Sequence, residues 1–190
     1  MRGTNEFRPW DLFPSWLDIS ESEEWMKQIN KNLIWDQPVV TVFGSSYLVP
    51  RMTNFIAEKD ISYSYSGFVH HGKGWPDWFY PLLEMVNSVS GVKYNGCLLN
   101  SYRNGNDRMG WHADNESELD LVKPISSLSL GATRDFALKH RNKKLRATLS
   151  LKTGDLLIMQ PTCQQEWLHS VPTRKKISNQ RINLTFRCYK

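Results

Sequence analysis

His112 and Asp114, together with His169 far downstream, are side chains whose types and spacing could hold a metal ion. Residues two apart on a β-strand point to the same side, so one strand would present both His112 and Asp114. His169 can join them only through the fold. Two imidazoles and one carboxylate on one face leave coordination positions open, which fits redox-active Fe(II) better than a closed structural site. A surface His beside a turn Asp gives the same spacing by chance.

A second group of polar residues lies near the C-terminus, at residues 181–187. Its alternation predicts a strand with apolar residues on one face and Arg181, Asn183, Thr185 and Arg187 on the other. Each of the two guanidinium groups can grip a carboxylate through two hydrogen bonds, so together they could bind a dicarboxylate. A solvated basic strand edge would explain the charges, but not why Asn and Thr share the face.

A chain of 190 residues is long enough for one domain with a sizeable core. Its formal net charge of +5 is compatible with a polyanionic partner, and some of its 8 Trp are expected on surfaces that stack or grip. Three cysteines without a CxxC pair argue against a disulfide framework and favour a reducing cytosol. We expect no signal peptide and no transmembrane helix, since no long apolar run occurs.

The first half of the chain predicts two helices and a hairpin, preceded by an irregular segment over residues 1–19. Ser20 and Glu23 match a capping box at the start of the first helix. Ser90 and Gly91 match the end of the second. The helices and strands expected in this half lie at 20–32, 39–43, 61–66 and 76–90.

From about residue 94 short strands alternate with turns, and little helix is expected. Such a run of strands suggests a double-sheet jelly roll. We therefore expect a mainly β fold of the α+β class and a single domain over 1–190. Within it, 1–95 supply the two helices and the hairpin, and 96–190 form the β-core. The strands expected in the core lie at 96–103, 108–112, 124–130, 134–139, 145–150, 155–160, 167–171 and 181–189.

Taken in order along the chain, these motifs resemble the AlkB family of Fe(II)/2-oxoglutarate dioxygenases, over roughly residues 39–188. Residues 124–132 and 169–172 are similar to the branch of the family that repairs nucleic acids, and 42–44 and 63–67 to its members that act on duplex DNA. The resemblance implies a double-stranded β-helix, a jelly-roll relative, with a nucleotide-recognition lid in front. The motifs that carry it are Asn100-x-Tyr102, His112-x-Asp114, His169 and Arg181-x-Asn183-Leu-Thr185-Phe-Arg187.

The resemblance implies that His112, Asp114 and His169 hold Fe(II), with 2-oxoglutarate and O2 as cosubstrates. Asn100 and Arg187 would bind the C1 end of 2-oxoglutarate. The reaction it implies yields succinate and CO2 and hydroxylates the N-methyl group of N1-methyladenine or N3-methylcytosine in DNA, which then loses formaldehyde. The side chains that would hold the C5 carboxylate and orient the cosubstrate are Arg181, Tyr102, Thr185 and Asn183.

A methylated base inside a duplex cannot reach a buried iron, so it must be flipped out or already single-stranded. The family pattern places Tyr63 and Tyr65 in the base pocket, with Tyr65 stacking opposite His112, although ordinary strand aromatics have the same spacing. Glu116 could accept a hydrogen bond from the exocyclic amine of adenine or cytosine, with Asn115 beside it. A solvated loop carboxylate is the alternative for Glu116.

Two other places along the sequence could contact the nucleic-acid chain. Phe43, beside Gly44, could fill the gap left by a flipped base, although a core Phe at a strand end is equally consistent. The basic runs Arg174-Lys175-Lys176 and 139–144 could contact phosphates, although many such runs are simply solvated.

The resemblance leaves the exact substrate open. An RNA demethylase would use the same chemistry, and a catalytically silent nucleic-acid-binding module would use the same fold. A zinc hydrolase is disfavoured because no HExxH motif is present. We expect a monomer that binds alkylated DNA, or RNA, and no membrane. Its compartment would be the cytoplasm in a bacterium and the nucleus in a eukaryote.

Overall fold

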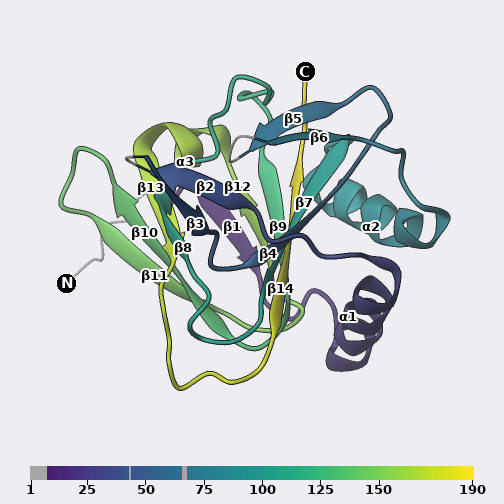
Figure 1. The fold of residues 1–190 in the computed structure, drawn as a ribbon, viewed down its shortest axis with the longest axis horizontal. Helices are drawn as coiled ribbons and strands as arrows, with labels where there is room; N and C mark the ends of the chain where they lie inside the picture. The colour runs from purple at the N-terminus through teal and green to yellow at the C-terminus, as the bar shows by residue number, and fades with distance from the viewer. Residues whose placement is uncertain (1–7, 43, 66–67) are drawn as a thin grey trace, which may run out of the picture.

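Two antiparallel sheets face each other in this computed structural model, which describes residues 8–42, 44–65 and 68–190, with backbone only at 41–42, 64–65 and 68. The large sheet has six strands, and β14 runs through its centre between β9 and β7 (Figure 1). Its strands, in spatial order, are β1 (Trp10–Phe13), β12 (Leu156–Met159), β9 (Ile125–Gly131), β14 (Arg181–Arg187), β7 (Gly96–Tyr102) and β4 (Met52–Ala57).

The small sheet has four strands and places β8 at one edge and β11 at the other. Two further hairpins stand outside both sheets, β2–β3 and β5–β6. The strands of the small sheet are β11 (Arg146–Leu151), β10 (Arg134–His140), β13 (Trp167–Val171) and β8 (Met109–His112). The hairpin strands are β2 (Val39–Val42), β3 (Ser45–Leu48), β5 (Ser62–Tyr65) and β6 (Phe68–His71).

Helices cover the side of the large sheet that faces away from the small one. Ile29 of α1 (Ile19–Asn32) and Leu82 of α2 (Tyr80–Ser90) are fully buried against Leu184 and its neighbours on the large sheet. A short 3-10 turn, η1 (Asp77–Phe79), precedes α2, and a third helix, α3 (Pro161–Glu166), links β12 to β13. Among the described residues, no helix is long and apolar enough to span a membrane.

The opposite face of the large sheet packs against the small sheet and forms a second core. Leu157 and Ile125 of the large sheet contact Phe136, Leu138 and other residues of the small one. Alternation along β14 therefore divides its side chains between two environments. Its apolar residues face the helices, and its Arg, Asn and Thr residues face the space between the sheets. This arrangement confirms the jelly-roll expectation and the polar face predicted for 181–187.

All eight strands expected between residues 96 and 189 are present, but several elements were not expected. The segment 1–19, expected to be irregular, contains β1, which pairs with β12. Strands β3, β4 and β6 and helix α3 also had no prediction. β1 and β4 form the two edges of the large sheet, so both halves of the chain contribute to it. The functional division at residue 95 stays a prediction.

The first helix begins two residues earlier than its predicted cap. Asp18 is the N-cap, and its carboxylate accepts a hydrogen bond from Glu21 N at 2.8 Å, while Glu21 Oε2 accepts one from Asp18 N at 2.9 Å. The prediction of Ser20 as the cap was wrong because 18–21 and 20–23 both fit a capping-box spacing. The structure selects the Asp-led one.

Candidate active site

Three side chains converge where β8 and β13 meet. His112, at the end of β8, pairs across the sheet with His169, and their rings are 4.2 Å apart. Asp114 Oδ1 lies 3.6 Å from His112 Nε2 and 4.0 Å from His169 Nε2. One donor atom from each residue lies within 4.8 Å of the others, so the three can hold one ion. Asp114 lies beyond the strand end, so the strand-alternation argument was wrong in detail.

The environment of the three residues favours their metal-binding forms. His112 Nδ1 lies 2.8 Å from the Gly110 carbonyl, which can only accept, so the proton sits on Nδ1 and Nε2 is left for a metal. Burial and the neighbouring His112 lower the pKa of His169 to about 3. A neutral imidazole is the ligand form. Gln164 of α3 holds the loop by accepting the Asp114 N–H at 3.0 Å.

Arg187 ties the metal-binding residues to the polar face of β14. Its Nη2 lies 2.9 Å from Asp114 Oδ2, and both side chains are buried. Burial alone would raise the pKa of Asp114. The Arg187 charge and the two imidazoles outweigh it, so the pKa falls below its usual range and the carboxylate stays charged. Burial alone would lower the pKa of Arg187, but the negative charge of Asp114 outweighs it and raises this pKa well above its ordinary value.

Buried guanidinium nitrogens show where an anion fits. The Nε and Nη1 atoms of both Arg187 and Arg181 are buried and have no hydrogen-bond partner among the described residues. Arg181 also donates from Nη2 to Ser129 Oγ at 2.9 Å and lies over the Tyr102 ring at 5.4 Å. Burial lowers the pKa of Arg181 to about 10, so it stays charged at neutral pH. Unpaired buried donors are costly, so these two arginines fit a carboxylate-bearing ligand.

One cavity brings most of the predicted residues together, between the two sheets. Arg181 does not line it directly and sits behind Tyr102. The three metal-ligand side chains at one side and the row of polar β14 side chains at the other give it both a metal end and an anion end. The predicted residues that line it are Tyr63, Asn100, Tyr102, His112, Asp114, Glu116, His169, Asn183, Thr185 and Arg187.

The cavity also contains residues that the sequence did not indicate. Arg51, directly before β4, is buried and donates from Nε to Asn100 Oδ1 at 2.7 Å, so it fixes the Asn100 amide. Phe136 stacks on the His169 ring at 5.1 Å. No motif indicated Arg51, because β4 itself was not predicted. The alternation of 134–140 could have identified Phe136 as facing inward, but not as a neighbour of His169.

Tyr63 and Glu116 form a pair at the cavity wall. The Tyr63 hydroxyl donates a hydrogen bond to Glu116 Oε1 at 2.8 Å, and burial raises the Tyr63 pKa far above its ordinary value. Tyr63 is packed edge-on against Tyr189, so its ring is a wall rather than an open stacking surface. Glu116 Oε2 is buried and has no hydrogen-bond partner among the described residues. A donor group in the cavity could bind it.

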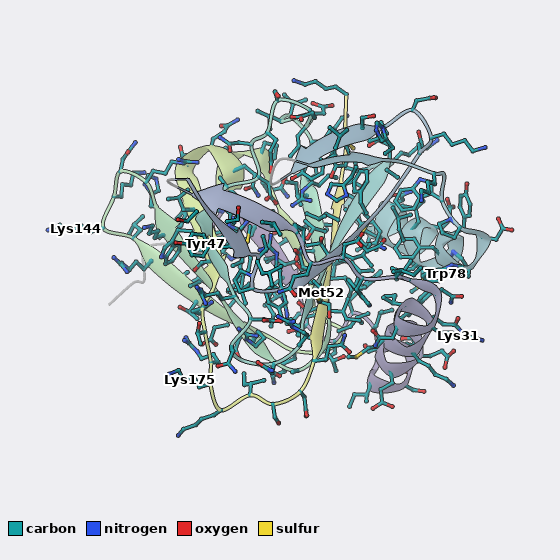
Figure 2. The ribbon with its side chains drawn as sticks, in the orientation of Figure 1. Lys31, Tyr47, Met52, Trp78, Lys144 and Lys175 are labelled. Atoms are coloured by element: carbon teal, nitrogen blue, oxygen red, sulfur yellow. The ribbon has the colours of Figure 1, made fainter. Side chains whose placement is uncertain are left out.

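The remaining predicted contacts lie elsewhere or outside the described part of the chain. Asn115 is exposed on the loop after Asp114. Arg174, Lys175 and Lys176 are exposed on the loop between β13 and β14, where Figure 2 labels Lys175 at the edge of the molecule. Arg174 pairs with Asp135, with 2.6 Å between Nε and Oδ2. Phe43 and the side chain of Tyr65 lie outside the described residues.

The chain resembles known oxygenases in sequence and fold. Residues 10–187 match the 2OG-Fe(II) oxygenase superfamily. The DNA oxidative demethylase ALKBH2 of Arabidopsis thaliana is 34% identical, over 90% of this chain and 63% of that protein. ALKBH2 of Mus musculus is 38% identical, over 78% of this chain and 65% of that protein. The human alpha-ketoglutarate-dependent dioxygenase alkB homolog 3 is 31% identical, over 93% of this chain and 64% of that protein.

Solved structures show the same fold at low identity. The structure titled OsALKBH1 has a TM-score of 0.67 at 18% identity and covers 96% of this chain and 100% of that one. A 2OG-Fe(II) oxygenase family oxidoreductase from Burkholderia pseudomallei has a TM-score of 0.62 at 13% identity, over 94% of this chain and 84% of that one. The chain spans less than two thirds of the length of the ALKBH2 relatives.

The chain therefore belongs to the 2OG-Fe(II) oxygenase superfamily, and within it to the AlkB family. The cofactors of this class are Fe(II), 2-oxoglutarate and O2. The site fits them, because the His-Asp-His group suits Fe(II) and the unpaired buried arginines suit a dicarboxylate.

Proposed function

We propose that this protein is an oxidative demethylase that repairs N1-methyladenine and N3-methylcytosine in DNA. The observation that carries the proposal is one buried cavity with the metal ligands and Arg187 at one end and the Glu116 carboxylate at its wall. The similarity to ALKBH2 proteins, which are named as DNA oxidative demethylases, supports the choice of substrate.

The residues of β14 and its neighbours bind and orient the cosubstrate. Arg187 holds Asp114 through Nη2 and keeps Nε and Nη1 for the C1 carboxylate of 2-oxoglutarate, with Asn100 beside it. Arg181 binds the C5 carboxylate, and Tyr102 and Thr185 complete that end. Asn183 donates to Ser127 Oγ at 2.8 Å and accepts from the Thr185 hydroxyl at 3.2 Å, which fixes the Thr185 side chain.

Fe(II) held by His112, Asp114 and His169 supplies the oxidising power when it is bound with 2-oxoglutarate and O2. The protein excludes water, because apolar side chains of the core between the sheets, among them Phe136 and Met159, line the cavity. Arg187 keeps Asp114 ionised, and the Gly110 carbonyl keeps His112 in the tautomer that offers Nε2. The hydroxylated methyl group then leaves the base as formaldehyde.

Glu116 and Tyr63 select the base. The Tyr63 hydroxyl holds one Glu116 oxygen, so the other is turned to the cavity and accepts a hydrogen bond from the exocyclic amine of adenine or cytosine. A carboxylate also favours a base made cationic by methylation. The base has to leave the stack to reach this place, and methylation on its pairing edge lowers the cost of doing so.

The other predicted contacts complete the proposal. Tyr65 stacks on the base opposite His112, Phe43 fills the gap left in a duplex, and Asn115 contacts the nucleotide at the cavity rim. Lys175 and Lys176 contact phosphates together with Arg174. The protein acts as a monomer. Its compartment is that of its DNA, the cytoplasm in a bacterium and the nucleus in a eukaryote.

The test is formaldehyde release from a single-stranded DNA oligonucleotide that carries N1-methyladenine, with Fe(II), 2-oxoglutarate and ascorbate. We expect release that requires the cosubstrate and is lost in His112→Ala. An RNA oligonucleotide of the same sequence distinguishes the RNA demethylase, since faster turnover on it would replace the DNA assignment. Succinate formation without formaldehyde release would keep the oxygenase and reject the substrate.

A further inference from the structure

The small sheet has an outer face, turned away from the metal site, that carries an exposed tryptophan. Trp111 precedes His112 on β8, so its side chain points to the opposite side of the sheet. Its side chain is 43% exposed, which is unusual for the largest aromatic residue and does not serve the core. Lys139 of β10 places Nζ 4.6 Å from the centre of the Trp111 ring. Lys139 therefore covers one face of the ring, and an aromatic ring and a cation are the two groups that hold a nucleotide by stacking and by charge.

The strands beside Trp111 carry a dense positive segment. Residues 139–146 contain five Lys and Arg residues and no Asp or Glu. Lys139 and Arg146 are direct partners across β10 and β11, so they lie on the same face as each other. Figure 2 shows Lys144 at the outermost point of the β10–β11 hairpin, on the side of the molecule opposite Lys31 of α1. The positive segment therefore projects from the sheet on which Trp111 lies.

The tip of this hairpin is held in one conformation by a buried histidine. His140 Nδ1 accepts hydrogen bonds from the backbone N–H groups of Asn142 and Lys143, both at 3.0 Å. The ring packs edge-on against Trp167 at 5.3 Å. A tip that is already ordered loses less conformational entropy when it binds, so its cations are preorganised for a ligand.

Two acidic groups near this side of the small sheet each have a neighbour that can bind them. Asp135 binds Arg174, and Glu166 Oε2 lies 3.5 Å from His140 Nε2. The positive charges of 139–146 are therefore left to attract a polyanion. Exposed Thr148 and Ser150 continue the same face along β11 and offer hydroxyl donors for phosphate oxygens.

We propose that this outer face binds a single-stranded segment of nucleic acid that flanks the target base, with a base stacked on Trp111 and its phosphates at Lys139, Arg146 and the hairpin tip. The proposal rests on the proposed function, since it assigns the same substrate a second place of contact. Trp111 and His112 lie on opposite faces of β8, and β8 is an edge strand. A flexible strand that passes around this edge can occupy both faces at once.

Equilibrium binding of an unmodified fluorescent single-stranded DNA tests the stacking contact. The protein is loaded with Fe(II) and 2-oxoglutarate in the absence of O2. We expect Trp111→Ala to weaken binding by about fivefold or more, and Trp111→Phe to restore most of the affinity, because stacking needs an aromatic face. Trp111→Leu keeps bulk without that face and should behave like Trp111→Ala. Tyr80→Ala is the matched control, because Tyr80 is 45% exposed on α2, away from this face.

Salt titration tests the phosphate contacts. For a single strand the slope of log K against log salt falls by about 0.7 for each lost contact, so Lys139→Ala with Arg146→Ala should reduce it by about 1.4. Lys31→Ala on α1 should leave the slope unchanged. Equal affinity and equal slope in wild type and these variants would overturn the proposal. So would full recovery of affinity in Trp111→Leu, which would show that the contact needs apolar bulk and not an aromatic face.

Turnover separates this proposal from the proposed function. With a methylated trinucleotide, which is too short to reach both faces, Trp111→Ala should match the wild type. With a long oligonucleotide its KM should rise while kcat is kept. Equal KM on the long oligonucleotide would overturn the outer-face contact and leave the demethylase intact. If no methylated substrate turns over, but unmodified DNA binding still depends on Trp111, the surface stands and the demethylase assignment falls.

Discussion

The cavity between the sheets and the wall where Tyr63 and Glu116 meet differ in how their charges are held. At the cavity, Asp114 and Arg187 line the space and Arg181 lies behind Tyr102; they come from loops and strands inside the jelly roll, and all three are buried. Tyr63 comes from β5, in a hairpin outside both sheets, and Glu116 from a loop. In the proposal, the chemistry is therefore placed on the jelly-roll core, and base selection on elements attached to it.

Two arginines that lie over the same tyrosine ring differ in how their donor groups are used. Arg134 and Arg181 both lie over the Tyr102 ring, at 5.5 Å and 5.4 Å, and both are buried. Arg134 donates from Nη1 and Nη2 to the carbonyl oxygens of Asn104, Asp107 and Pro172, which leaves only its Nε without a partner among the described residues. Arg181 keeps two nitrogens without a partner among the described residues. Similar burial therefore serves mainly the fold in Arg134, whereas in Arg181 it leaves two donors for the carboxylate of the proposal.

The largest expected effect comes from the core. Asp114→Ala removes a metal ligand and leaves Arg187 as a buried unpaired charge. We expect loss of Fe(II) binding and of turnover, and a decrease of about 3–5 kcal/mol in the free energy of unfolding of the metal-free protein. Urea denaturation and a metal-binding titration measure the two effects. Asp135→Ala is the control, since its exposed pair with Arg174 should cost about 1 kcal/mol or less. Comparable stability losses would remove the distinction between the two pairs.

The next largest effect is expected on the binding of 2-oxoglutarate. Arg181→Lys keeps the charge but loses the two-pronged grip on a carboxylate, so the KM for 2-oxoglutarate should rise by about tenfold or more, with the KM for DNA unchanged. Succinate formation at varied 2-oxoglutarate measures it. Arg134→Lys is the matched control and should lower the melting temperature without changing either KM. An Arg134→Lys variant with the same rise in KM would show that both arginines act through Tyr102 alone.

A smaller effect is expected at the wall. Tyr63→Phe removes one hydrogen bond to Glu116, worth about 1 kcal/mol, so the KM for a methylated oligonucleotide should rise about fivefold. Glu116→Gln loses the carboxylate charge and should have a larger effect on the same constant. Neither should change the slow conversion of 2-oxoglutarate measured without DNA, because neither residue touches the cosubstrate in the proposal. A matching loss of that background conversion would place Glu116 with the metal site instead.

The sequence predicted the core better than its attachments, and the reason is physical. Strand β14 alternates strictly, so the periodicity of 181–187 alone separated Arg181 and Arg187 from the apolar residues between them. The metal site followed from residue types and the resemblance. What spacing could not supply was contact between distant segments, such as the bond from Arg51 to Asn100 or from Gln164 to the Asp114 N–H.

The strands that the sequence did not predict share one feature: each forms because a neighbouring strand offers an edge to pair with. β1 has four residues and exists because β12 offers an edge. β4 reads Met-Thr-Asn-Phe-Ile-Ala, without clear alternation, and is fixed by its register with β7. Local propensity is weak for such segments and tertiary pairing decides them. The N-cap of α1 was also undetermined by sequence, because two overlapping segments fit the capping-box spacing equally well. The structure has the capping-box hydrogen bonds at Asp18 and Glu21.

The smallest expected effect tests the proposed role of Phe43. Phe43 follows β2 in the sequence, and the proposal gives it no contact with the metal or the cosubstrate. If it fills the gap of a flipped base, Phe43→Ala should lower activity on duplex DNA by a few-fold and leave single-stranded DNA unaffected, because a single strand has no gap to fill. Initial rates on both forms of one methylated sequence measure this, with Tyr47→Ala on β3 as the control. An equal loss on both forms would make Phe43 a structural residue of the hairpin, and recognition of duplex DNA would then have to come from other contacts.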